Sequence, residues 1–197
     1  MRAFFGILSF IFSFGAAIPY AFDILKGRAR PARSTRILFF LLMLVTLFVQ
    51  SRGFTSWVLL LTVGEVATQF TVLYLSIKHG IGGLARLDLI CYVAFAISLT
   101  TYLITKDPAL SLTLLMLTDL IAFIPTMIKI WRDPTSDSWL FFVIGGLAAA
   151  AASFFARSGN SYTEIAFPIY LFIGNFLAVL PIFLHMHRTK KRTYPLV

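Results

Sequence analysis

The sequence predicts an all-α membrane protein with seven transmembrane helices. Of its 197 residues, 59% are hydrophobic and 13% carry a charge, and the mean hydropathy is +0.88. A water-soluble domain of this size is far more polar. The apolar residues gather in runs of roughly the length, about 20 residues, at which a helix crosses the hydrocarbon core of a bilayer. Short polar segments separate these runs, so no extramembrane domain is expected.

The expected helices follow from the boundaries between the apolar runs. Charge combined with Gly or Pro gives the firmest boundaries, at Lys78-His79-Gly80, Lys106-Asp107-Pro108 and Arg132-Asp133-Pro134. The second run is the shortest, so we expect its helix to extend by about a turn into the flanks beside Arg36 and Gln50. Six spans is the alternative count. The seven expected spans are residues 3–25, 35–50, 57–78, 84–105, 109–131, 138–157 and 164–186.

The first apolar run also has the layout of a cleaved signal peptide. Arg2 precedes it, and the small residues Gly15, Ala16 and Ala17 lie where cleavage would occur. However, five basic residues follow the run, the last of them Arg36 at the start of the next one, and one precedes it. This asymmetry is the reverse of the one that exports the following segment, so we expect the run to remain as a helix.

The basic residues predict the orientation in the membrane. With seven spans, thirteen Lys and Arg side chains fall on one side and four on the other, the four being Arg2, Arg52, Lys106 and Arg157. Basic loops stay in the cytoplasm, so the N-terminus is expected outside and the C-terminus inside. The pI near 10.1 is then explained by these cytoplasmic basic residues, which are also attracted to the anionic lipids of the cytoplasmic leaflet. A nucleic-acid partner is therefore not expected.

The sequence also contains an internal repeat across three successive spans. Ala16-Ala17-Ile18-Pro19 aligns with Ala122-Phe123-Ile124-Pro125 at an offset of 106. Leu38-Phe39-Phe40 then aligns with Leu140-Phe141-Phe142, and Gly64-Glu65 with Gly174-Asn175 at an offset of 110. Duplicated helix bundles are common in transporters, which bind their solute between the copies. The repeat predicts triple-helix units at residues 1–80 and 107–197, the second with a basic tail, joined by a linker helix in 81–106.

In this layout the chain resembles the PQ-loop, SWEET and related seven-helix transporters. Their architecture is two parallel triple-helix bundles joined by an inversion helix (3+1+3). Pro19-Tyr20 and Pro125-Thr126 stand here where the namesake family has proline and glutamine. The resemblance implies a small-solute transporter that works by alternating access, with proton coupling left open. Because the family also includes the KDEL receptor, a receptor-like or ligand-binding protein of the same fold is the alternative.

Polar residues deep inside the spans indicate where such a site would lie. By helical rise, Asp119 lies about 15 Å and Glu65 about 12 Å from the start of its expected helix, and Asn175 lies about 16 Å. An ionised carboxylate at that depth costs several kcal/mol unless it is paired or protonated. No Lys or Arg occurs at the same depth. The two acids therefore form either a solute or proton site, or neutral hydrogen bonds between helices.

Helical spacing then selects the candidate site residues. Thr62, Glu65 and Gln69 share one face of the third span, and Tyr170 and Asn175 lie broadly on one side of the seventh. The resemblance places Asn175 at the substrate and Glu65 at the position of a second substrate-binding asparagine, and it suits Asp119 to proton coupling. We therefore expect the solute at Asn175, Glu65, Gln69 and Tyr170, and the proton at Asp119 and Glu65.

Two prolines and several absences complete the expectations. Pro19 and Pro125 each fall 16 residues into their expected helices, where a proline removes a backbone hydrogen bond, so both are candidate hinges. The sequence has no H-E-x-x-H, no G-x-S-x-G and no phosphate-binding loop, so no enzyme activity is expected. A single cysteine, Cys91, argues against disulfides and cysteine-bound metal. No cofactor is expected, while the identity of the solute and homo-oligomerisation stay open.

Overall fold

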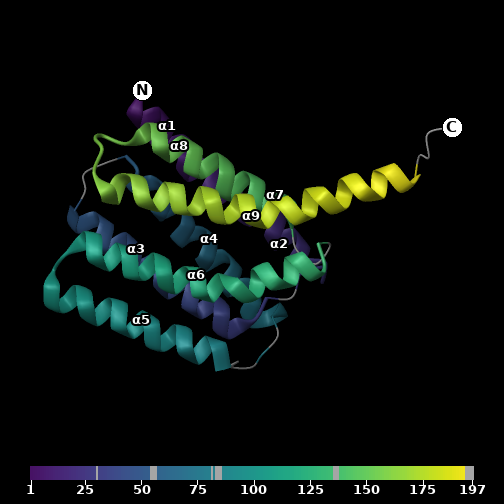
Figure 1. Cartoon of the computed structure of the whole chain (residues 1–197), viewed down its shortest axis with the longest axis horizontal. Coiled ribbons are helices and arrows are strands. Elements are labelled where there is room, and N and C mark those ends of the chain that lie inside the picture. Colours follow the sequence, from purple (N-terminus) through teal and green to yellow (C-terminus); the bar gives the residue numbers. More distant parts are fainter. Residues whose placement is uncertain (30, 54–56, 81, 83–85, 135–137, 194–197) are drawn as a thin grey trace.

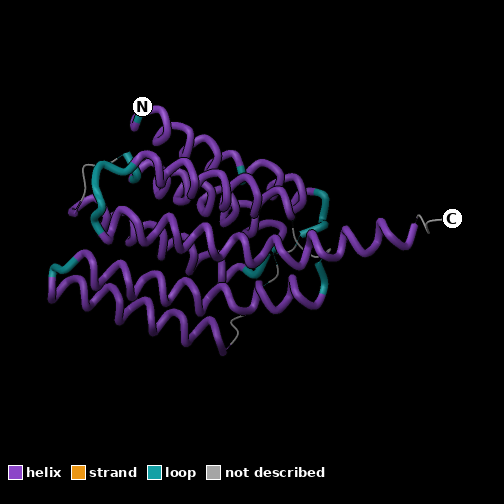
Figure 2. Tube along the Cα trace, turned by 45° about the horizontal axis from the view of Figure 1, so that its top comes forward, coloured by secondary structure: helices purple, strands orange, loops and turns teal. Residues whose placement is uncertain are grey.

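Seven helices are long and apolar enough to cross a membrane in the computed structural model, which describes residues 1–29, 31–53, 57–80, 82, 86–134 and 138–193. The predicted count of seven is therefore confirmed, and the described residues form no strand. Successive spans run in alternating directions along one axis (Figure 1). Short connections join them, and α9 ends at the opposite end of the molecule from the start of α1 (Figure 2). The spans are Arg2–Leu25, Arg33–Arg52, Leu59–His79, Asp88–Thr105, Pro108–Arg132, Trp139–Ala156 and Tyr162–His187.

Two of these spans are interrupted. The first consists of α1 (Arg2–Gly15) and α2 (Ala17–Leu25), which meet at Ala16. The sixth consists of α7 (Trp139–Phe141), the π-helix η1 (Phe142–Ala148) and α8 (Ala149–Ala156). The others are continuous: α3 (Arg33–Gly53), α4 (Leu59–His79), α5 (Arg86–Thr105), α6 (Pro108–Arg132) and α9 (Tyr162–Thr193).

The helix ends agree with the sequence signals at several positions. The second span extends beyond the predicted 35–50 at both ends, as expected. Asp107 caps α6, because its carboxylate accepts hydrogen bonds from the backbone N–H groups of Ala109 at 2.9 Å and Leu110 at 3.2 Å. Pro108 occupies the first position of the same helix, where no N–H is needed. Gly27 adopts a φ of 70° and turns the chain after α2.

Six of the seven spans form a closed ring. α1 packs against α4, α4 against α3, and α3 against α6. α6 packs in turn against α9, α9 against η1 and α8, and these two against α1. The fourth span, α5, lies outside the ring, against α3 and α6. The ring therefore encloses a central axis that α5 does not reach.

Small residues bring the helices of this ring close together. A Cβ atom added at Gly64 of α4 would lie 2.8 Å from the Cβ of Ser13, and one at Gly145 of η1 would lie 2.6 Å from the Cβ of Ala16. Both distances are too short for non-bonded carbon atoms, so the absence of a side chain permits the contact. Gly145 thus allows close packing of the sixth span against the first.

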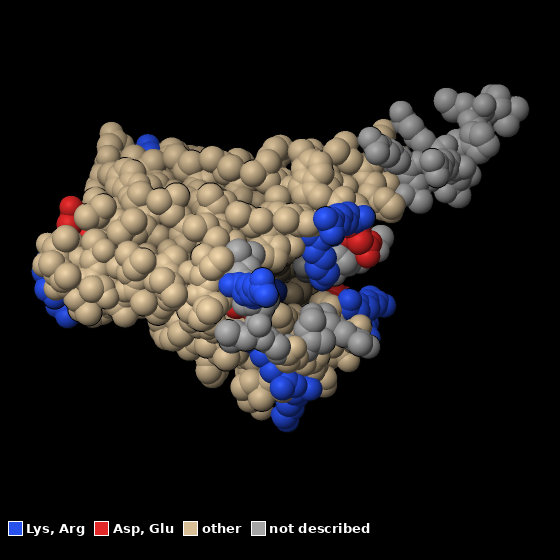
Figure 3. Space-filling view, turned by 60° about the horizontal axis from the view of Figure 1, so that its bottom comes forward, with Lys and Arg blue, Asp and Glu red and all other residues tan. Residues whose placement is uncertain are grey.

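The two ends of the ring differ in charge. Most described Lys and Arg side chains lie at the end where α2, α4 and α6 finish, which we call the basic end, and they surround a hollow there (Figure 3). In the other half of the bundle, the side chains of Leu61, Leu112, Leu115 and Phe167 are each at most 1% exposed and belong to one hydrophobic cluster. The bundle is thus densely packed away from the basic end.

Candidate functional site

A cavity lies inside the ring, and the centres of water-sized molecules can occupy about 90 Å³ of it. All six ring spans contribute to its wall, and α5 contributes none. It reaches from Arg36, about one turn into α3, to Asp119, about 16 Å from the start of α6. The polar lining residues are Ser13, Arg36, Glu65, Thr68, Gln69, Asp119, Tyr170 and Asn175. The apolar wall comes from Phe39, Met43, Phe123, Phe141, Phe142 and Leu171, with small residues between them.

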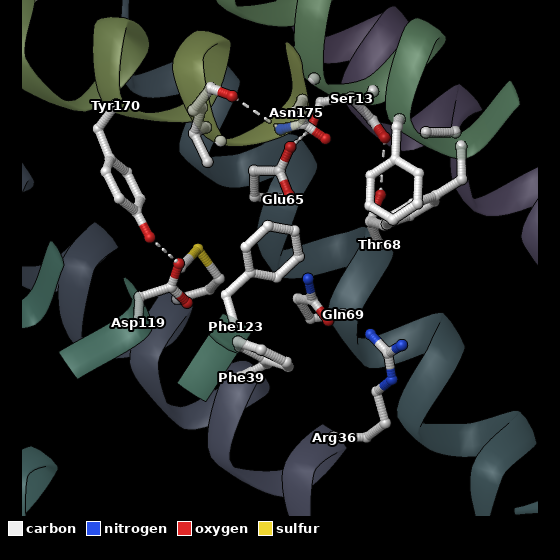
Figure 4. A pocket seen from close by; sticks show the side chains of 18 residues that line it. Ser13, Arg36, Phe39, Glu65, Thr68, Gln69, Asp119, Phe123, Tyr170 and Asn175 are labelled. Atoms are coloured by element: carbon white, nitrogen blue, oxygen red, sulfur yellow. Dashed lines mark hydrogen bonds between the residues drawn. The ribbon is translucent and has the colours of Figure 1, made fainter. Parts of the chain in front are cut away.

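The cavity brings together the residues predicted to bind solute or protons. Glu65 and Gln69 from α4, Asp119 from α6, and Tyr170 and Asn175 from α9 all line it. Figure 4 shows them entering one space from different helices. This grouping is what the helical spacing predicted, although the sequence alone gave no distances between the helices.

The first deep acid is held by a serine from another helix. Ser13 of α1 donates a hydrogen bond from its hydroxyl to Oε1 of Glu65, at 2.7 Å. The Ser13 carbonyl accepts a second hydrogen bond from the Thr68 hydroxyl, at 2.8 Å. Both bonds join α1 to α4. They fix the Glu65 side chain while leaving its second carboxylate oxygen, Oε2, without a partner among the described residues.

The second deep acid is held in the same manner. Tyr170 of α9 donates a hydrogen bond from its hydroxyl to Oδ2 of Asp119 of α6, at 2.6 Å. The Tyr170 ring stacks near that of Phe167, with 6.5 Å between the ring centroids. Within the described ranges, Oδ1 of Asp119 has no hydrogen-bond partner, and neither Asp119 nor Glu65 forms a salt bridge. Each of the two carboxyl groups thus has one oxygen with a hydrogen-bond partner and one without a partner among the described residues.

Two amide side chains complete the polar lining. Asn175 donates from Nδ2 to the carbonyl of Leu171 at 2.8 Å and packs directly on Gly146, where an added Cβ would overlap its side chain. Oε1 of Gln69 is buried and accepts no hydrogen bond in the described structure. A buried carbonyl oxygen without a donor is uncommon in proteins. The other end of the same amide, Nε2, makes no hydrogen bond with the described residues and is the part of Gln69 that the cavity reaches.

Arg36 lies at the mouth of the cavity and was counted only as a loop base in the sequence. Its Nη2 donates a hydrogen bond to the Tyr20 hydroxyl at 2.6 Å. The guanidinium carbon lies 5.1 Å from the Tyr20 ring centroid and 5.8 Å from that of Phe39. These contacts hold the charge against aromatic rings. The Tyr20 ring also lies 4.8 Å from that of Phe141, so it connects α2 to the sixth span at the mouth.

Some predicted features lie elsewhere. Thr62 was expected on the same polar face as Glu65, but its hydroxyl donates to Oε1 of Gln50 in α3 and does not reach the cavity. Pro19 lies in the first turn of α2, just after the break at Ala16. Pro125 lies within the uninterrupted helix α6. Neither proline lines the cavity, although Ala16 and Phe123 beside them do.

The sixth span approaches the cavity through its π-helix. Phe142, Gly145 and Gly146 of η1 line the wall, and π-helical turns often occur at functional sites. The described residues bring no three His, Cys, Asp or Glu side chains together as a metal site.

Comparisons with protein-family models, curated proteins and solved structures found no match to this chain.

Proposed function

We propose that this protein is a small-solute membrane transporter that works by alternating access, with the ring cavity as its solute site. The observation that carries the proposal is a cavity open toward one end of the bundle, with its polar groups near the middle of the spans and dense apolar packing beyond them. Transporters bind their solutes at that depth, where access can switch from one side to the other.

The ring order supports two triple-helix bundles joined by a linker helix. The first, second and third spans correspond in this arrangement to the fifth, sixth and seventh. When each span is exchanged with its counterpart, every pair of neighbouring spans in the ring becomes another pair of neighbours, so the two units have equivalent places in the ring. In each proposed unit a hydrogen bond joins the first helix to the third, from Ser13 to Glu65 in one and from Tyr170 to Asp119 in the other. Ser13 and Asp119 are 106 residues apart, which is the repeat offset.

The charge distribution supports an N-terminus outside and a C-terminus in the cytoplasm. The basic end carries thirteen of the seventeen Lys and Arg residues of the sequence when the spans alternate, and such loops remain cytoplasmic. The cavity, lined at its mouth by Arg36, would then face the cytoplasm. A reporter fused after Val197 tests this orientation, and a signal from the outer side would contradict it.

Switching to the other access state would require two changes. The cluster of Leu61, Leu112, Leu115 and Phe167 would separate, and the mouth between Tyr20 and Phe141 would close. The break between α1 and α2 at Ala16 offers a hinge on the cavity wall, since the proline at position 19 cannot donate its backbone hydrogen bond. Pro125 would have the same role in α6.

Uptake into proteoliposomes tests the function. A panel of labelled sugars, vitamins, amino acids and amines is offered with and without a pH gradient, which also tests proton coupling through Asp119 and Glu65. Asp119→Asn should lower uptake of any transported solute at least about tenfold, because it changes a charged group in the cavity. Asp107→Asn is the matched control: it is the same change in the same helix, and Asn also caps helices.

Three outcomes separate the candidate functions. Uptake that Asp119→Asn abolishes and Asp107→Asn preserves supports transport through the cavity. Saturable solute binding without uptake or exchange would contradict transport and support the receptor-like alternative. Uptake that is insensitive to Asp119→Asn and Glu65→Gln would place the pathway outside this cavity.

A further inference from the structure

We propose that the cavity takes solutes that carry a protonated amine, with the ammonium group held by Glu65 and Asp119; this rests on the transport function proposed above for the same site. The inference starts from what the cavity lining leaves unsatisfied. Among the described residues, its two deep carboxyl groups each have one oxygen without a partner and neither forms a salt bridge, so a ligand that supplies N–H groups and a positive charge is the complementary one.

The acceptors come from both halves of the ring. Oε2 of Glu65 and Oδ1 of Asp119 have no partner among the described residues, while each other oxygen is held by a hydroxyl. Oε1 of Gln69, one turn from Glu65 on α4, is buried without a donor and would join this set only if the amide turned toward the cavity. The Nδ2 group of Asn175 already donates to its own helix at Leu171. An ammonium group has three donors and no acceptor, which matches this set.

Among the described residues that line the cavity, the one cation does not neutralise these acids. Arg36 lies apart from both of them at the mouth (Figure 4), where it donates to Tyr20 and lies over two aromatic rings. A carboxylate removed from water needs a cation or a proton. A bound ammonium ion would balance one of the two carboxylates and a proton on the other carboxyl would balance the second, and both carboxyls would hold a proton when the site is empty.

The walls are suited to the rest of such a solute. The aromatic rings of Phe39, Phe123, Phe141 and Tyr170 line the same cavity as the acids. Aromatic faces attract organic cations and pack against apolar bodies. An anionic solute would instead meet two carboxyl groups at the deep end. The cavity thus favours an amine with an apolar or aromatic body.

Binding to the purified full-length protein in detergent tests the proposal. Primary amines from methylamine to tyramine are titrated by calorimetry, each beside the alcohol with the same carbon skeleton, and tyramine also beside 3-(4-hydroxyphenyl)propionate. The best amine should bind at least about tenfold more tightly than its alcohol, since charge-assisted hydrogen bonds are about twice as strong as neutral ones. Glu65→Gln and Asp119→Asn should each remove most of that preference, while Asp107→Asn should retain it.

Glu65→Gln and Asp119→Asn each keep an oxygen that can accept the hydrogen bond from Ser13 or Tyr170. Thermal unfolding of each variant verifies that it folds. The proposal is overturned if no amine binds, if the alcohol or the carboxylate binds as tightly, or if neither variant reduces the preference. Amine binding is measured without a membrane and transport is measured with one, so each of the two proposals can be contradicted without the other. Uptake of neutral solutes without amine preference would overturn this one alone, whereas amine binding without flux would overturn transport alone.

Discussion

Gly64→Ala tests whether the contact between α1 and α4 positions Glu65. A Cβ at residue 64 would lie 2.8 Å from the Cβ of Ser13, 3.0 Å from its Oγ and 3.1 Å from the carbonyl oxygen of Phe10. Two of these atoms belong to the backbone or lie next to it, so relief requires α1 to move away from α4. That movement would draw the Ser13 hydroxyl away from Glu65, where it now donates at 2.7 Å.

Three terms set the size of the effect on the free energy of unfolding, two that lower it and one that raises it. Overpacking a well-packed interior costs about 1–3 kcal/mol, and weakening the Ser13–Glu65 hydrogen bond adds about 1 kcal/mol. Replacing a helical glycine by alanine raises the free energy of unfolding by about 1 kcal/mol, because alanine has the higher helix propensity. We therefore expect Gly64→Ala to lower the free energy of unfolding by about 1–3 kcal/mol.

Gly174 provides the matched control, because it aligns with Gly64 in the repeat and an added Cβ there meets nothing within 4 Å. Gly174→Ala should leave the free energy of unfolding unchanged or raise it by up to about 1 kcal/mol. Both variants are measured by denaturant titration in mixed micelles, monitored by circular dichroism. If Gly64→Ala is as stable as Gly174→Ala, the proposed close contact between α1 and α4 is refuted.

Two further predictions concern the wall of the cavity and its closed end. Gly146→Ala would overlap the Asn175 side chain, so it should displace that amide and weaken solute binding at least about tenfold in calorimetry; unchanged affinity would show that Asn175 does not contact the solute. Thr62→Val removes the hydroxyl that donates to Gln50, whose side chain is buried with Nε2 already lacking a partner. It should cost about 1–3 kcal/mol in the same denaturant titration, whereas Thr62→Ser, which keeps the hydroxyl, should cost less; equal losses would argue against the hydrogen bond.

Much of the site could be predicted because depth and helix face are local properties. The distance of Asp119 and Glu65 from their helix ends follows from helical rise, and the grouping of Glu65 with Gln69 follows from the helical period. Both acids and their expected companions Tyr170 and Asn175 indeed line one cavity. Their hydrogen-bond partners could not be predicted, since Ser13 and Glu65 are 52 residues apart in the sequence.

Arg36 shows why other parts of the site could not be predicted. Its position at the end of an apolar run is typical of a loop base that faces lipid headgroups. It becomes part of the cavity because α3 begins at Arg33, one turn earlier, and because Tyr20 offers a hydroxyl and a ring at that level. Those partners lie on a different helix, so no local pattern contains them.

The sequence by itself determined that this protein has seven helices long and apolar enough to cross a membrane, where each one lies and how far its polar residues are from the helix ends, because hydropathy and helical rise act along a single helix. Only the tertiary structure decided which face of each helix meets the cavity. Thr62 and Glu65 lie three residues apart on one face, yet one donates to Gln50 and the other accepts from Ser13. The two side chains have different partners because a different helix packs against α4 at each of these two positions. Close contacts such as Gly64 against Ser13 decide which helix packs where. Such contacts depend on the fit between two distant segments, which the order of residues along one helix does not contain.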